Sequence, residues 1–151
     1  MEKKFVKILE KICGALLVGM VLLLFAQVAT RYILRGSLLW AGEMAVWLFV
    51  WISFLGSVVL LVNNKHIVVD LVSSILPKKA NDFLAKINSL IVTAFLAVMV
   101  YHSIPVVVSY SRQTATSIAV SKFFLFSSLT VSMFLMMVYS AYSFIKKVRG
   151  R

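Results

Sequence analysis

The sequence predicts an all-α integral membrane protein with four transmembrane helices, and three observations lead to that prediction. Hydrophobic residues make up 62% of the 151-residue chain, and the mean hydropathy is +0.98. Charged residues account for only 14%, about half the share that is usual in soluble domains. The apolar residues are gathered in four long runs whose central parts carry no charge. A soluble domain could not cover so much apolar surface, so we expect that surface to face lipid.

Each of the four runs is long enough to cross a bilayer, because about 20 helical residues span roughly 30 Å of hydrocarbon. The sequence predicts spans at approximately residues 12–33, 40–62, 87–110 and 123–145. No polar stretch between them is large enough for a soluble domain, so we expect residues 1–151 to form a single membrane domain.

The basic residues predict the orientation of the spans. Of the 16 lysines and arginines, four lie before residue 12, four lie between residues 64 and 87, and four follow residue 145, whereas the other two connections hold two each. Because cytoplasmic segments are enriched in Lys and Arg, we expect both termini and the middle connection to be cytoplasmic. The same pattern indicates that the net charge of +11 is a topology signal rather than a nucleic-acid interface.

The connection between the second and third spans contains a short amphipathic segment at approximately residues 66–76. On a helix, His66 and Asp70 fall on a polar face, and the opposite face consists of Ile, Val and Leu. This pattern favours a helix that is too short to span and lies in the membrane interface. The alternative is an extension of a neighbouring span packed on the bundle. His66 and Asp70 are spaced to pair with each other, and with Lys65 they form a motif that we interpret as structural.

Ionisable side chains at membrane depth mark ion and substrate pathways, because each costs roughly 2.5–3.5 kcal/mol at the centre of a span. The central parts of the four predicted spans contain no Asp, Glu, Lys or Arg. The chain therefore lacks a carboxylate relay for protons, which argues against a stand-alone small exporter. It also shows no internal repeat of the kind found in many complete transporters.

Residues that bind cofactors are equally scarce. The single cysteine, Cys13, excludes an intramolecular disulfide and a thiolate metal site. His102, in the third predicted span, is the kind of residue that ligates haem in the membrane anchors of respiratory enzymes. A second axial histidine would be needed, and the only other one, His66, is expected across the membrane. We therefore interpret His102 as a hydrogen-bonded histidine near the membrane interface, and we expect no catalytic residue, no metal and no cofactor.

The second predicted span carries three tryptophans and an acid along one helical stripe. Trp40, Glu43, Trp47 and Trp51 are spaced i, i+3, i+7 and i+11, and we call them the tryptophan stripe. An aromatic belt at the lipid interface would suit Trp40, but Trp51 lies about 16 Å deeper along a helix. We therefore favour a protein–protein interface over a lipid belt. Arg31, at the end of the first span, is placed to pair with Glu43.

Short motifs follow one another in order along nearly the whole chain, after a basic N-terminal segment. They are Arg31-Tyr32, Trp40-Ala41-Gly42-Glu43, Phe49-Val50-Trp51, Phe54-Leu55-Gly56, Lys65-His66-Ile67, Asp70-Leu71 and Leu76-Pro77. In this order and spacing, the sequence resembles the small membrane subunit (DctQ-like) of tripartite ATP-independent periplasmic (TRAP) transporters. It departs from the family pattern in two places. Gly42-Glu43 stands where two adjacent acids are common, and Val46-Trp47 stands where an arginine often follows.

The resemblance implies a non-catalytic subunit of a bacterial inner-membrane transporter. Such a transporter uses the sodium gradient to take up an organic acid, for example a C4-dicarboxylate or sialic acid. Two protein partners are implied: a large membrane subunit (DctM-like), which carries the substrate and sodium sites, and a periplasmic substrate-binding protein. Membrane lipids are a further partner. The alternatives are the membrane anchor subunit of a respiratory enzyme and a stand-alone small exporter.

The same resemblance suggests roles for individual residues. The tryptophan stripe, together with Arg31, would contact the large subunit. Arg35, Arg112 and Lys122 lie in the two connections that we expect to face the periplasm. Their positive charges would attract an acidic docking surface on the binding protein, an effect that salt weakens.

Overall fold

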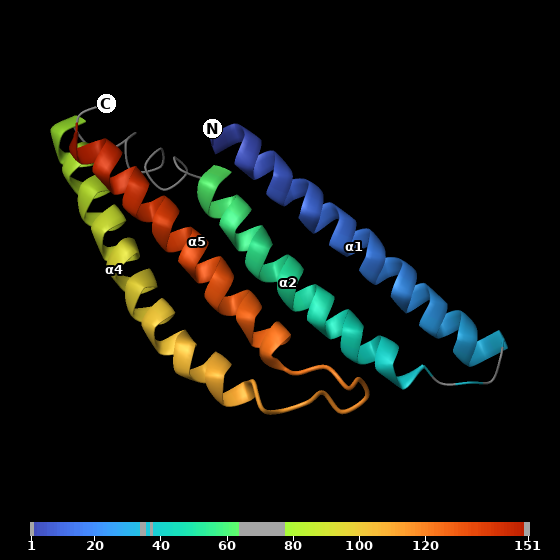
Figure 1. Ribbon diagram of the computed structural model, residues 1–151. Helices are drawn as coiled ribbons and strands as arrows, with labels where there is room; N and C mark the ends of the chain where they lie inside the picture. Colours follow the sequence, from blue (N-terminus) through green and yellow to red (C-terminus); the bar gives the residue numbers. More distant parts are fainter. Residues whose placement is uncertain (1, 34–35, 37, 64–77, 150–151) are drawn as a thin grey trace.

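The computed structural model describes residues 2–33, 36, 38–63 and 78–149. Most of these residues lie in four α helices (Figure 1), which are α1 (Glu2–Ile33), α2 (Leu39–Asn63), α4 (Lys78–Tyr110) and α5 (Phe123–Val148). Each helix contains a stretch that is long and apolar enough to cross a membrane, as the sequence predicted. The interfacial helix predicted at residues 66–76 lies outside the described residues.

Helices α1 and α4 begin well before the spans that the sequence predicts. Helix α1 starts at Glu2 rather than near residue 12, because the preceding segment is rich in Lys and Glu, which favour helix. This extra segment also has a reason to pack, since Val6 and Leu9 lie on one face and are buried against α2. Helix α4 starts at Lys78 and continues through Pro105, a residue that membrane helices tolerate better than soluble ones do.

The helices form an open row in the order α1, α2, α5, α4 (Figure 1). Helix α1 packs on α2, α2 on α5, and α5 on α4, and no other pair of helices packs together within the described residues. Along the helix axes, the first residues of α1 and α4 lie at the same end of the bundle as the last residues of α2 and α5 (Figure 1). Helices α1 and α4 are therefore edge helices, each with one packed neighbour.

A hydrophobic cluster joins α1, α2 and α5 at the end of the bundle where α1 begins. Val58 of α2 is fully buried at its centre, and Leu55 and Val62 lie one turn to either side. Leu9 of α1 packs on this face, and Met136 is among the α5 residues that close it. This cluster aligns the three helices by contact between apolar side chains, which is the main force holding such helices together in lipid.

The contact between α4 and α5 is made through small polar side chains. The Thr130 hydroxyl donates to Ser103 Oγ across the contact at 3.0 Å, and the hydroxyl groups of Thr93 and Ser140 lie 2.8 Å apart. Ser128 is fully buried in α5. Small side chains let helix backbones approach closely in lipid, and hydroxyl pairs add interhelical hydrogen bonds.

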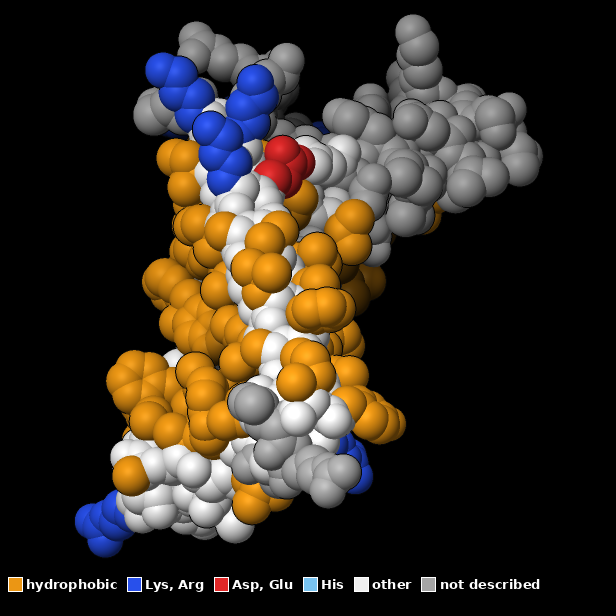
Figure 2. Space-filling model, turned by 90° about the vertical axis from the view of Figure 1, so that its right-hand side faces the viewer, with side chains coloured by type: hydrophobic (Ala, Val, Ile, Leu, Met, Phe, Trp, Pro, Cys, Tyr) orange, Lys and Arg blue, Asp and Glu red, His pale blue; other side chains and the backbone are white. Residues whose placement is uncertain are grey.

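The surface of the row is apolar along its middle. Figure 2 shows hydrophobic side chains over the middle of the molecule, with Lys and Arg gathered at its two ends. Large apolar residues are exposed on both edge helices, among them Phe25 of α1 and Phe95 of α4. Lipid or another membrane protein must cover these faces.

Candidate partner-binding site

The loop between α4 and α5, residues 111–122, folds back on itself at the end of the bundle where α2 begins (Figure 1). The Lys122 N–H donates to the Gln113 carbonyl at 2.8 Å, and the Ala115 N–H donates to the Val120 carbonyl at 2.9 Å. A single antiparallel bridge pairs Thr114 with Ser121. These bonds close a short hairpin, which we call the α4–α5 hairpin, and its tip projects toward α2.

Glu43 of α2 holds the tip of this hairpin. Its Oε1 accepts a hydrogen bond from the Thr116 N–H at 3.1 Å, and its Oε2 accepts one from the Ser117 N–H at 2.7 Å. A carboxylate can bind two successive backbone donors at once with charge-assisted bonds. This arrangement differs from the expected pairing with Arg31. Within the described part of the chain no ion pair joins the two side chains, and Arg31 is exposed at the end of α1.

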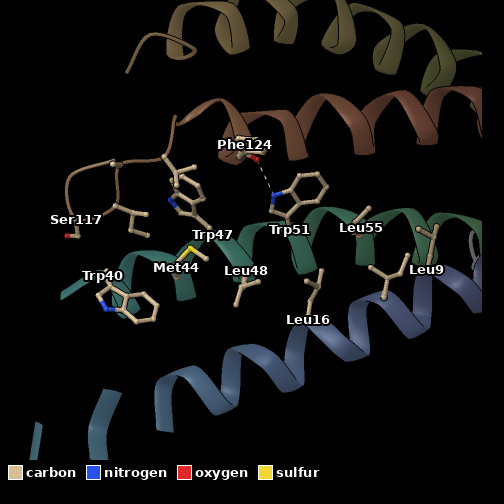
Figure 3. A pocket seen from close by; sticks show the side chains of 14 residues that line it. Leu9, Leu16, Trp40, Met44, Trp47, Leu48, Trp51, Leu55, Ser117 and Phe124 are labelled. Carbon is tan, nitrogen blue, oxygen red and sulfur yellow. Dashed lines mark hydrogen bonds between the residues drawn. The ribbon is translucent and has the colours of Figure 1, made fainter. Parts of the chain in front are cut away.

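The tryptophans of the stripe differ in their surroundings. Trp40 is 43% exposed and Trp47 is buried. Trp51 is half-buried, and its indole N–H donates to the Phe124 carbonyl at 3.1 Å. Figure 3 shows Trp47 pointing toward the hairpin and Trp51 pointing toward the start of α5. The inner part of the stripe therefore stabilises the contact of α2 with the hairpin and α5.

A long apolar groove runs along α2 between α1 and the hairpin (Figure 3), with a volume of about 990 Å³. All three tryptophans of the stripe line it. The other lining residues are Leu9, Ile12 and Leu16 of α1, Met44, Leu48 and Leu55 of α2, and Ser117, Ile118, Ala119, Val120 and Phe124 of the hairpin and α5. Because its lining is apolar and its volume is large, the groove favours an apolar occupant of substantial size, such as a helix face or a lipid chain.

The other predicted site residues do not join this groove. Arg112 is exposed and Lys122 is half-buried at the two bases of the hairpin. The remaining docking residue and the interfacial-helix motif lie outside the described residues, namely Arg35, Lys65, His66 and Asp70. His102 lies exposed on α4, away from the stripe. The structure therefore brings the tryptophans and Glu43 together with the hairpin, and leaves the basic residues at its rim.

Sequence reasoning missed the groups that Glu43 and Trp51 bind. They are backbone atoms, namely the N–H groups of Thr116 and Ser117 and the carbonyl of Phe124. Backbone groups have no residue-type signature, so no sequence pattern could identify them. Among the described residues no group of three or more His, Cys, Asp or Glu side chains could hold a metal ion.

Comparison with known proteins identifies the family. The sequence pattern of the family described as tripartite ATP-independent periplasmic transporters, DctQ component, matches residues 20–150. The chain belongs to this family. Members are subunits of membrane transporters, not enzymes, as the resemblance implied. Membership implies a multi-pass protein of the bacterial inner membrane, in agreement with the four spanning helices.

Three curated relatives carry related descriptions. The sialic acid TRAP transporter permease protein SiaT of Haemophilus influenzae is 26% identical over 131 residues, or 87% of this chain and 21% of the relative. A putative TRAP transporter small permease protein of the same species is 34% identical over 71 residues, or 47% of this chain and 44% of the relative. The C4-dicarboxylate TRAP transporter small permease protein DctQ of Vibrio cholerae is 33% identical over 92 residues, or 60% of this chain and 38% of the relative. The matched segments thus span less than half of each relative's own length.

Proposed function

We propose that this family member braces the large membrane subunit of a TRAP transporter and helps the periplasmic binding protein to dock. Family membership carries the proposal, because homologues are components of tripartite transporters. The relative SiaT adds support. The matched region is 21% of that permease, so a counterpart of this chain is a minor part of a longer permease polypeptide there.

The proposed orientation places the α4–α5 hairpin in the periplasm and the starts of α1 and α4 in the cytoplasm. The distribution of Lys and Arg supports it. The arrangement of the helices supports it as well, because the end of α1, the start of α2 and the α4–α5 hairpin all lie at the opposite end of the bundle from the start of α1 (Figure 1). Arg112 and Lys122 would then face the periplasm.

The groove is the proposed contact surface for the large subunit. Trp47 and Trp51 form its inner wall, while the exposed ring of Trp40 and the half-buried side chains of Met44 and Leu48 are within reach of a partner. A partner helix would bury these side chains and gain apolar contact without unsatisfied polar groups. Arg31, exposed at the same end, would lie at the rim of that contact.

The proposed docking surface for the binding protein is the hairpin and its basic rim. Glu43 and Trp51 fix the hairpin on α2, so the surface is held in one arrangement before docking. Preorganisation reduces the ordering cost of association. The positive charges of Arg112 and Lys122, and of Arg35 in the other connection that we propose to face the periplasm, would steer an acidic surface.

The transported substrate is proposed to be an organic acid carried by sodium-driven symport. The names of two relatives mention sialic acid and C4-dicarboxylate. Both kinds of compound carry carboxylate groups. The described parts of this chain have no free cationic cluster at membrane depth, and the groove is apolar. The substrate and sodium sites are therefore assigned to the large subunit.

Co-purification tests the scaffold role. A tagged form of this chain, extracted from membranes that also express the cognate large permease, is expected to retain that permease. A photo-crosslinking amino acid at Leu48, in the groove, is expected to form an adduct with it. A large permease that assembles and functions without binding this chain would contradict the proposal.

A further inference from the structure

His102 is an exposed ionisable residue close to the middle of a membrane span. The span in α4 runs Lys86–Tyr110, so its midpoint is Val98 and His102 lies about four residues beyond it. At 1.5 Å per residue this displacement is about 6 Å, within a hydrocarbon layer whose half-thickness is about 15 Å. With this span centred in the bilayer, the imidazole lies at hydrocarbon depth.

Among the described residues the imidazole has one aromatic contact. The ring of Tyr101 meets it edge-on, with centroids 5.4 Å apart and planes at 81°. Tyr101 is itself 72% exposed. No hydrogen bond or ion pair to the imidazole is formed by any residue that the structure describes.

His102 belongs to the face of α4 that points away from the row. Leu96, Ser103 and Val107 are the buried residues of α4. On the other side, positions spaced i, i+4, i+7 and i+11 from Ile91 are all exposed, and they are Ile91, Phe95, Val98 and His102. We call these four residues the outer stripe of α4. Since α4 packs only on α5, nothing in the described chain covers the outer stripe.

Lipid is a poor cover for this stripe. Hydrocarbon tails cannot accept or donate a hydrogen bond, and an unpaired polar group there is costly. Lys and Arg relieve that cost by extending to the headgroups, but the short imidazole would have to bridge about 9 Å. Ionisable residues at such depth in membrane proteins almost always face another protein segment or a polar cavity.

We infer that the outer stripe of α4 is a second contact surface for the large subunit, and that a transmembrane helix of that subunit presents a hydrogen-bonding side chain to His102. This inference rests on the proposed function and adds a surface to it. The imidazole can both donate and accept, so a carboxylate, hydroxyl or amide side chain fits. A large permease fits better than a second copy, because in the relative SiaT the counterpart of this chain is part of a much longer permease polypeptide.

Site-specific photo-crosslinking in the assembled complex tests the surface. A benzoylphenylalanine at Val98, which is 56% exposed at the centre of the α4 span, is expected to form an adduct with the large permease. The matched control is Val18, which is 57% exposed at the centre of the α1 span Lys4–Ile33 and is expected to give lipid adducts. Lipid adducts alone from Val98, or an adduct between two copies of this chain, would overturn the inference.

Substitution of His102 tests the hydrogen bond. His102→Phe keeps an aromatic ring and removes both hydrogen-bonding nitrogens. Interhelical hydrogen bonds in membranes correspond to roughly 3- to 20-fold in association, so we expect recovery of the large permease to fall within that range. His102→Gln, which keeps a donor and an acceptor, should restore most of it. Equal recovery with Phe and Gln would overturn the role of the hydrogen bond.

The proposed function is tested separately by the same material. If the wild-type chain retains the large permease and crosslinks to it from Leu48 in the groove but not from Val98, only the α4 surface is wrong. If the wild-type chain retains no large permease, the scaffold role itself is wrong.

Discussion

The backbone N–H of Ser117 donates a 2.7 Å hydrogen bond to the carboxylate of Glu43, and this bond joins two segments that are 74 residues apart in sequence. The neighbouring N–H of Thr116 binds the other carboxylate oxygen at 3.1 Å. About 12 Å further along α2, Trp51 binds the Phe124 carbonyl at the start of α5. The α4–α5 hairpin is therefore attached to α2 at both its tip and its base, and should move with α2 as one unit.

Replacing Glu43 with Gln tests the attachment of the hairpin tip. The amide has one acceptor oxygen in place of two and carries no charge, so the amides of Thr116 and Ser117 should exchange hydrogen faster. Hydrogen–deuterium exchange with mass spectrometry, on protein in lipid nanodiscs, measures this rate. The control is Glu10→Gln at the other end of the row, where the acid accepts a bond from the Asn63 side chain. Unchanged exchange in Glu43→Gln would show that the carboxylate does not hold the hairpin.

Replacing Trp51 with Phe tests the attachment at the base. The change keeps an aromatic ring but removes the donor to Phe124, and the free energy of unfolding should fall by about 1 kcal/mol. Unfolding in mixed micelles of detergent and sodium dodecyl sulfate measures it. The control is Trp40→Phe, at an exposed ring, for which a change within about 0.5 kcal/mol is expected. Equal effects of the two substitutions would argue against a specific role for the indole N–H.

Reversing the charges of Arg112 and Lys122 to Glu tests the docking surface. We expect slower association with the periplasmic binding protein, because charged rims act mainly on the association rate. Surface plasmon resonance on the reconstituted complex should show the defect at low ionic strength, and the difference should shrink as salt is added. Lys11→Glu, at the opposite end of the row, is the control. A defect of equal size at all salt concentrations would mean that the residues act through structure rather than charge.

The proposed orientation can be tested by thiol labelling. In a Cys13→Ser background, Ser117→Cys in the exposed hairpin tip should react with a membrane-impermeant maleimide in spheroplasts, whose inner membrane is intact. Ala80→Cys, at the start of α4, should react only after the inner membrane is permeabilised. The reverse pattern would invert the topology and place the basic rim in the cytoplasm.

The four helices could be predicted from sequence because apolar run length is a direct physical requirement for crossing a bilayer. The early start of α1 was less apparent, since Val6 and Leu9 look like isolated apolar residues in a basic segment until α2 is placed beside them. The order of the row was also out of reach. It depends on which helix faces fit together, as in the hydrogen bond between Thr130 and Ser103.

The tryptophan stripe shows how a sequence pattern can leave its partners undetermined. The spacing of Trp40, Glu43, Trp47 and Trp51 identified one helical face. Sequence reasoning looked for a partner of Glu43 among charged side chains and chose Arg31, whereas the structure supplies backbone N–H groups.

In the proposed function, this chain supports transport by a larger partner and does not transport alone. An uptake assay tests this division of roles, in vesicles with an imposed sodium gradient, the purified periplasmic binding protein and radiolabelled C4-dicarboxylate or sialic acid. We expect uptake when this chain and the large permease are reconstituted together, and none with this chain as the single membrane protein. Sodium-driven uptake into vesicles that contain this chain without the large permease would contradict it.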